Sequence, residues 1–71
     1  MYSVCYIING RRVWRINCKN HTYYFKTKQA YHEHLAVALA RAKDYKKTYP
    51  ACCVEVESFY NNRPCYYITI I

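Results

Sequence analysis

The chain has 71 residues and a formal net charge of +7. It forms a single small domain, residues 1–71, near the lower size limit at which a hydrophobic core suffices without disulfides or a structural metal. It is 54% hydrophobic and contains one Gly and two Pro, which argues against a disordered chain. Eleven Lys and Arg against four acidic residues predict attraction to a polyanion, most commonly nucleic acid; the alternative is a basic protein without such a partner.

The five cysteines cannot all pair within the chain. The opening residues 1–4 lack the basic region of an export signal, and an odd cysteine count without such a signal favours reduced thiols in a cytoplasm. The apolar runs are too short to span a bilayer. We therefore expect a soluble cytoplasmic protein that does not enter a membrane.

A β-hairpin is predicted at the start of the chain. Residues 2–8 are β-branched and aromatic, and Asn9-Gly10 follows them. This dipeptide is the strongest short hairpin signal, because both turn positions need a positive φ. The return strand, residues 11–18, then pairs Tyr6 with Val13. The same register pairs Ile8 with Arg11, Cys5 with Trp14 and Ser3 with Ile16.

A second tight turn at Lys19-Asn20 would add a third strand, pairing Ile16 with Tyr23 and Trp14 with Phe25. Both turns sort the side chains onto the same two faces, and we expect the face with Trp14 to form the core. That face carries Cys5, Ile7, Trp14, Ile16, Cys18, Tyr23 and Phe25. The other carries Tyr2, Val4, Tyr6, Ile8, Arg11, Val13, Arg15, Thr22, Tyr24 and Lys26.

A helix is predicted from Gln29 to about Lys46. Thr27 is a suitable N-cap, and the Ala-rich middle favours a helix on propensity alone. Pro50 ends the segment. One stripe should pack on the Trp14 face. Its members are Tyr31, Leu35, Ala38, Leu39, Ala42 and Tyr45.

The last segment predicts a second hairpin, with strands at residues 51–60 and 65–71. Alternation points the side chains of Val54 and Val56 inward. A three-residue loop, Asn61-Asn62-Arg63, or a β-bulge is then needed to bring Ile68 and Ile70 onto the same face, because a two-residue turn alone would set them beside the glutamates. The fold class is therefore α+β: an antiparallel sheet of about five strands in the order βββαββ, with one helix on one face.

No residue pattern indicates catalysis, a cofactor or a metal site. The four acidic residues show no catalytic pairing, and no Gly-rich phosphate loop is present. Cys52 and Cys53 are adjacent and would point to opposite sides of a strand, and His32 and His34 do not converge on a helix. We expect a protein that is not an enzyme.

The sharpest candidate site is the sheet face that the helix leaves open. Arginines there can grip phosphates, and tyrosines can stack on unpaired bases. Lys26 and Lys28 flank the helix N-terminus, where free amides bind anions. A solvated face with ordinary surface charges is the alternative. The predicted nucleic-acid or partner-binding residues are Arg11, Arg12, Arg15, Lys26, Lys28, Tyr2, Tyr6 and Tyr24.

The junction Phe25-Lys26-Thr27-Lys28-Gln29-Ala30 resembles that of the arm-type DNA-binding domains of phage integrases. The resemblance covers about residues 2–45 and implies a sheet that enters a DNA major groove. It would place Arg11, Arg15 and Tyr24 on the DNA-facing surface. The size and the Tyr- and Lys-rich composition also resemble small early proteins of tailed phages, many of which bind and block a host protein.

Two functions follow as hypotheses. The first is a small, non-enzymatic protein that binds DNA or RNA through the basic and aromatic sheet face. The second is a phage-encoded protein, located in the cytoplasm of a bacterial host cell, that inhibits or redirects a host protein through tyrosine anchors. A homodimer, formed through an edge strand or through Ala36, Val37 and Ala40, is compatible with either.

Overall fold

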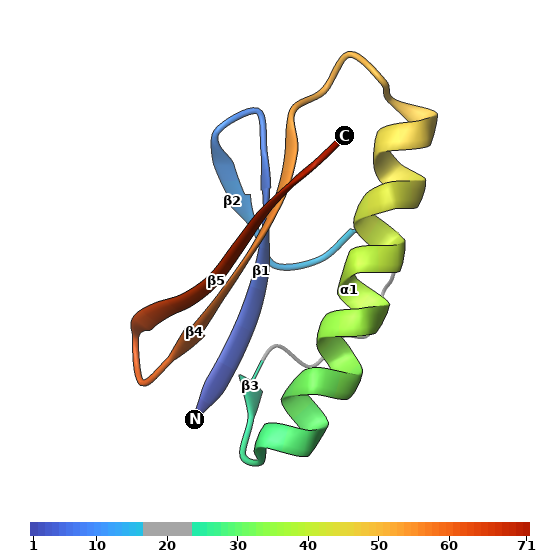
Figure 1. The fold of residues 1–71 in the computed structure, drawn as a ribbon. Helices are drawn as coiled ribbons and strands as arrows, with labels where there is room; N and C mark the ends of the chain where they lie inside the picture. The colour runs from blue at the N-terminus through green and yellow to red at the C-terminus, as the bar shows by residue number, and fades with distance from the viewer. Residues whose placement is uncertain (17–23) are drawn as a thin grey trace.

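The computed structural model describes residues 1–16 and 24–71, which form five strands and one helix. This confirms the predicted α+β class and the element order βββαββ. The helix lies across one face of the sheet (Figure 1). The elements are β1 (Tyr2–Ile8), β2 (Arg11–Val13), β3 (Tyr24–Phe25), α1 (Lys28–Thr48), β4 (Val54–Tyr60) and β5 (Arg63–Ile70).

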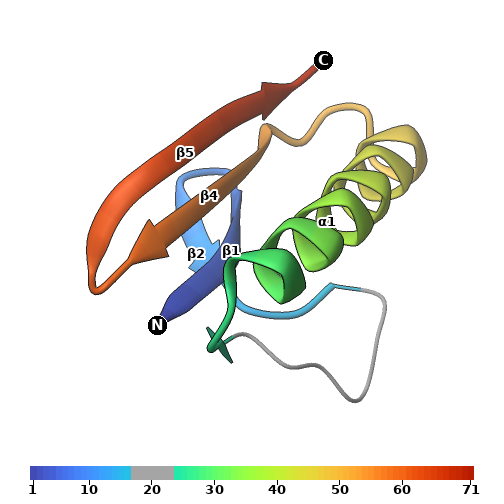
Figure 2. The same ribbon diagram turned by 60° about the horizontal axis from the view of Figure 1, so that its bottom comes forward.

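Strand β1 lies at the centre of an antiparallel sheet ordered β2-β1-β4-β5. The short strand β3 pairs with the first residues of β1, on the edge that β2 occupies further along. Strand β5 forms the opposite border of the sheet, beyond β4 (Figure 2).

The Asn9-Gly10 turn is confirmed. Asn9 and Gly10 have φ values of 52° and 80°, and the turn pairs Ile8 with Arg11 and Tyr6 with Val13 as predicted. Asn9 also fastens the turn to the start of the second hairpin: its N–H donates to the Cys53 carbonyl at 2.9 Å, and its side-chain oxygen accepts from the Cys53 N–H at 2.9 Å.

The third strand is placed differently from the prediction. Strand β2 ends at Val13, and β3 pairs with β1, with Tyr24 opposite Ser3. The predicted pairing of Trp14 with Phe25 is therefore wrong, and so are the pairings of Cys5 with Trp14 and Ser3 with Ile16. The backbone N–H and C=O groups on both edges of the central strand β1 need hydrogen-bond partners, and β3 pairs with the part of one edge that the short β2 leaves unpaired. The predicted Lys19-Asn20 turn and Tyr23 lie outside the described residues.

The core forms on the other face of β1 from the one predicted. Strand β4 pairs Val56 with Tyr6, so the two valines of β4 share a face with Val4 and Tyr6, and the helix packs there. The alternation within β1 could not decide between faces, because this central strand is buried on both: Ser3, Val4, Cys5 and Tyr6 are all buried. The buried hydrophobic cluster comprises Val4, Tyr6, Ile16, Tyr31, Leu35, Ala38, Ala42, Val54, Val56 and Ile70.

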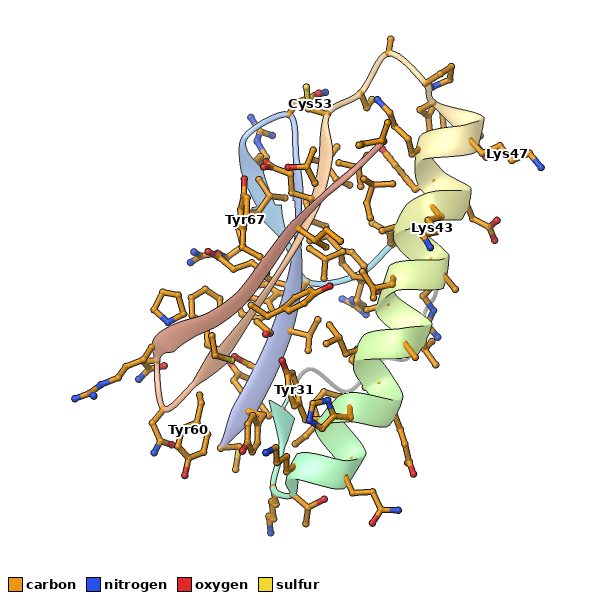
Figure 3. All side chains as sticks on the ribbon, in the orientation of Figure 1. Tyr31, Lys43, Lys47, Cys53, Tyr60 and Tyr67 are labelled. Carbon is orange, nitrogen blue, oxygen red and sulfur yellow. The ribbon has the colours of Figure 1, made fainter. Side chains whose placement is uncertain are left out.

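The helix and its predicted stripe are confirmed. Thr27 caps α1, since its hydroxyl oxygen accepts from the Ala30 N–H at 3.1 Å. Of the stripe, Tyr31, Leu35, Ala38 and Ala42 are buried, while Leu39 and Tyr45 are partly buried against the core. Tyr31 reaches from the helix to the sheet (Figure 3), where its hydroxyl lies 2.7 Å from the buried Ser58 hydroxyl.

The predicted register of the last hairpin is confirmed: Val54 faces Ile70 and Val56 faces Ile68. The structure achieves it with the bulge. Asn61 and Asn62 make a tight turn with φ values of 49° and 66°, and the register shifts between Ser58 and Phe59. The extra residue in β5 restores the parity that the two-residue turn alone would break.

Candidate functional site

The predicted basic and aromatic face is not assembled as one surface. Tyr6 is fully buried in the core beneath the helix. Tyr2 is half-buried on the same side, where its ring stacks on Tyr31 at 4.7 Å and lies 4.6 Å from Tyr60. These two tyrosines therefore support the fold, because the face that carries them is the one that packs on the helix.

Arg12 and Tyr24 lie on the open face of the sheet. Arg12 forms an ion pair with Glu57, and its guanidinium lies 5.2 Å above the Phe59 ring. Tyr24 is 55% exposed, with its ring 6.2 Å from that of Trp14. A shallow hollow of about 230 Å³ joins these groups, but its arginine faces a carboxylate. The hollow is lined by Ser3, Arg12, Trp14, Tyr24, Phe59 and Asn62.

Lys26 and Lys28 are exposed at the N-terminus of α1. The first turn of the helix contains no acidic residue, so no carboxylate there offsets the two lysines or the helix dipole. Their surroundings are consistent with the predicted attraction for an anion, but they lie at the opposite end of the helix from Tyr45, next to β3 (Figure 1).

Arg11 and Arg15 meet in an open groove of about 550 Å³ between the β1–β2 hairpin and the second half of α1. Arg11 stands opposite Ile8, on the helix side of the sheet, and both arginines are exposed. Aliphatic residues and one tyrosine accompany the two arginines in its lining. Its lining residues are Ile8, Asn9, Arg11, Val13, Arg15, Ile16 and Tyr45.

The groove is strongly positive. In the described part of the chain, no acidic residue belongs to its lining, whereas two arginines do. Arg41 lies one helical turn before Tyr45 and therefore on the same side of α1. Guanidinium groups bind phosphates and carboxylates through paired N–H donors, and the aliphatic lining residues lie beside the two arginines. The arrangement is suited to an anionic group with a flat or apolar attachment.

Sequence reasoning identified both arginines but missed Tyr45 and the groove. Tyr45 was assigned to the core stripe of the helix, and it is only partly buried at the end of that stripe. The signal in the sequence was the position of Tyr45 as the last residue of the stripe. It lies near the C-terminal end of the helix, where a short hairpin covers less of the helix surface. Tyr49, which is not part of the lining, has its ring 4.8 Å from that of Tyr45.

Two further findings concern the described residues alone. They contain no group of three or more His, Cys, Asp and Glu side chains that could hold a metal ion. None of their helices has both the length and the apolar character needed to cross a membrane.

Comparisons of the chain with protein-family models, with curated proteins and with solved structures give no match. The resemblance to arm-type DNA-binding domains therefore stays a prediction. In the structure, Arg11 and Arg15 lie on the helix side of the sheet and Tyr24 does not share their groove, so these three residues do not form one DNA-facing surface.

Proposed function

We propose that the protein is a non-enzymatic nucleic-acid-binding protein that holds the polyanion in the groove of Arg11 and Arg15. The observation that carries this proposal is the lining of the groove: two arginines, a tyrosine and no carboxylate among the described residues. The net charge of +7 adds long-range attraction to any polyanion. This moves the site from the open face, where Glu55 and Glu57 accompany Arg12.

The groove favours a flexible or single-stranded segment over a regular duplex. Arg11 and Arg15 would neutralise phosphates, and the Tyr45 ring offers a surface for a neighbouring base. Such contacts depend on backbone charge and stacking and read little sequence. The lysines at the start of α1 would contribute to general attraction without belonging to the groove.

Fluorescence anisotropy with labelled single-stranded DNA and RNA tests the proposal. The informative variant is R11A/R15A, and the matched control is K43A/K47A, which removes the same charge from exposed positions of α1 (Figure 3). We expect the arginine variant to lose about tenfold or more in affinity and the lysine variant to lose much less, since each phosphate contact is local.

Salt dependence provides the second readout. Two lost phosphate contacts should reduce the slope of log K against log salt by about 1.4 on single strands. Equal losses in both variants would mean that only net charge matters, and would contradict the groove. Absence of binding at low salt would contradict the nucleic-acid function altogether.

We also infer a second candidate function, binding of a host protein, from the exposed tyrosines. Tyr24, Tyr49, Tyr60 and Tyr67 are each about half exposed, with values of 55%, 52%, 47% and 55%. Half-exposed tyrosines are typical anchors of protein interfaces. A pull-down from bacterial lysate separates the two functions: a partner that survives nuclease and is lost in Y60A or Y67A supports this one, and a partner lost with nuclease supports the first.

A further inference from the structure

Strand β5 has a free edge. It pairs with β4 on one side, and no strand among residues 1–16 and 24–71 covers its other side. Figure 2 shows β5 at the border of the sheet, beyond β4, and the strand order puts β2 at the other border. In an antiparallel strand, alternate residues direct their N–H and C=O groups away from the existing neighbour, so this edge presents backbone groups that a further strand can bind.

The edge lacks the features that keep most edge strands apart. Charged side chains, proline and bulges are the usual protection, and here Arg63, Pro64 and the bulge all lie in the first part of β5. The remaining stretch, residues 66–70, has the sequence Tyr-Tyr-Ile-Thr-Ile, without charge or proline. Tyr67 and Ile68 are 55% and 38% exposed on it. This stretch is suited to pairing.

We propose that β5 pairs antiparallel with β5 of a second copy of this chain, around a two-fold axis at Ile68. An interface of this kind is self-complementary, because the same strand supplies both halves. The register sets Ile68 against its copy, Tyr67 against Thr69 and Tyr66 against Ile70. Side chains keep their faces in this register, so both helices lie on the same side of one continuous sheet.

The charge distribution favours a second copy over an acidic segment of another protein. The net charge of +7 would attract an acidic partner, but Arg63 is the only charged residue of β5, and it lies outside the paired stretch. The proposed register sets no like charges directly opposite each other. The arginine groove lies at the β2 border, so a dimer leaves both grooves open.

The exposed apolar residues of α1 offer a weaker dimer contact. Ala36, Val37 and Ala40 are exposed, but they supply no backbone groups for pairing, and the charged residues Glu33, Lys43, Asp44 and Lys47 surround them. Val37 is 44% exposed, close to the value for Ile68, and therefore provides a matched control.

Sedimentation equilibrium of the nucleic-acid-free protein over a range of concentrations tests the proposal. The wild-type chain should show a reversible monomer–dimer equilibrium that strengthens with added salt, because salt screens the repulsion between two +7 chains. I68K should shift the protein to monomer, since it sets two lysines against each other at the axis. V37K introduces the same charge at a similarly exposed aliphatic residue and should leave the dimer intact.

The outcomes are distinct. A wild-type monomer at every concentration and salt overturns the proposal, and so does a dimer that V37K disrupts and I68K does not. Far-ultraviolet circular dichroism of both variants tests whether each is folded. If I68K is unfolded, Y67K tests the same edge from the open face of β5, because it sets a lysine against Thr69 of the second copy and should also shift the protein to monomer. Because salt should strengthen the dimer and weaken nucleic-acid binding, failure of one proposal is separable from failure of the other.

Discussion

Arg12 and Glu57 lie 3.3 Å apart, guanidinium nitrogen to carboxylate oxygen, on the sheet face that the helix leaves open. Arg12 is on β2 and stands opposite Ile7 of the central strand β1, and Glu57 is on β4 and stands opposite Cys5 of the same strand. The ion pair therefore bridges across β1. It offsets the charge of the one arginine described on that face. This relationship is the physical reason for locating an anion site in the groove of Arg11 and Arg15.

Replacing Arg12 with alanine should therefore have little effect on binding. The Arg12 side chain is 54% exposed, so solvent screens the ion pair, and R12A should lower the free energy of unfolding by less than about 1 kcal/mol. Binding of single-stranded nucleic acid should weaken less in R12A than in either R11A or R15A. Urea unfolding and anisotropy measure the two effects. If R12A equals R11A in its binding defect, the open face is the site after all.

The Tyr31–Ser58 contact should matter more for stability. The two hydroxyls lie 2.7 Å apart, and Ser58 is fully buried. Tyr31→Phe removes one partner and leaves the other with the weaker thiol contact of Cys65 at 3.4 Å, so we expect a loss of about 1–2 kcal/mol in urea unfolding. Tyr67→Phe, at an exposed position, should be neutral. Equal effects of the two changes would show that the buried contact contributes nothing.

The strand pairing could be predicted where turn chemistry and parity fix it. Asn9-Gly10 determines the first register, and the need to place Ile68 and Ile70 with the valines of β4 predicts either a three-residue loop or a bulge, of which the structure has the bulge. The choice of core face could not be predicted from β1 alone. Its alternation separates Cys5 and Ile7 from Val4 and Tyr6, and both sets are apolar; pairing with β4, distant in sequence, decides between them.

The residues of the candidate groove could be predicted in their types and not in their assembly. Arg11 and Arg15 were predicted to share a face, and both line the groove, although Arg15 lies beyond the end of β2 at Val13. Arg12, which follows Arg11 on β2, points to the opposite face, where Glu57 meets it. Tyr45 joins the arginines only through the packing of α1 on the sheet, a contact that no local pattern encodes.

Asn9 should stabilise the fold through both its backbone and its side chain. Its φ of 52° disfavours most residues, and its side-chain oxygen accepts from the Cys53 N–H. Asn9→Ala should lower the free energy of unfolding by about 2 kcal/mol, because it introduces strain and removes an acceptor. Asn9→Gly retains the positive φ and removes only the side-chain bonds, so it should cost less. Thermal unfolding that ranks glycine below alanine would contradict this account.

Cys5 should make the fold sensitive to alkaline pH. The thiol is fully buried beside Arg12 and Glu57, and burial raises its pKa above the ordinary value, with the Arg12 charge opposing the shift less strongly. The folded state therefore holds its proton at pH values where the unfolded state has lost it. The stabilisation is complete below the unfolded pKa of about 8.5 and decreases as pH rises from there through the folded pKa, by at most about 1.4 kcal/mol per pH unit.

Urea unfolding at pH 7 and in the alkaline range, compared between wild type and Cys5→Ala, measures this contribution. Tyrosines and lysines also titrate at high pH, so the informative quantity is the difference between the two pH slopes. Cys5→Ala should show a shallower decline than wild type, whereas Cys53→Ala, at an exposed thiol, should retain the wild-type slope. Iodoacetamide should likewise modify Cys53 rapidly and Cys5 only on unfolding, because the thiolate is the reactive form and Cys5 is enclosed. Equal slopes for wild type and Cys5→Ala would show that the thiol ionises alike in both states.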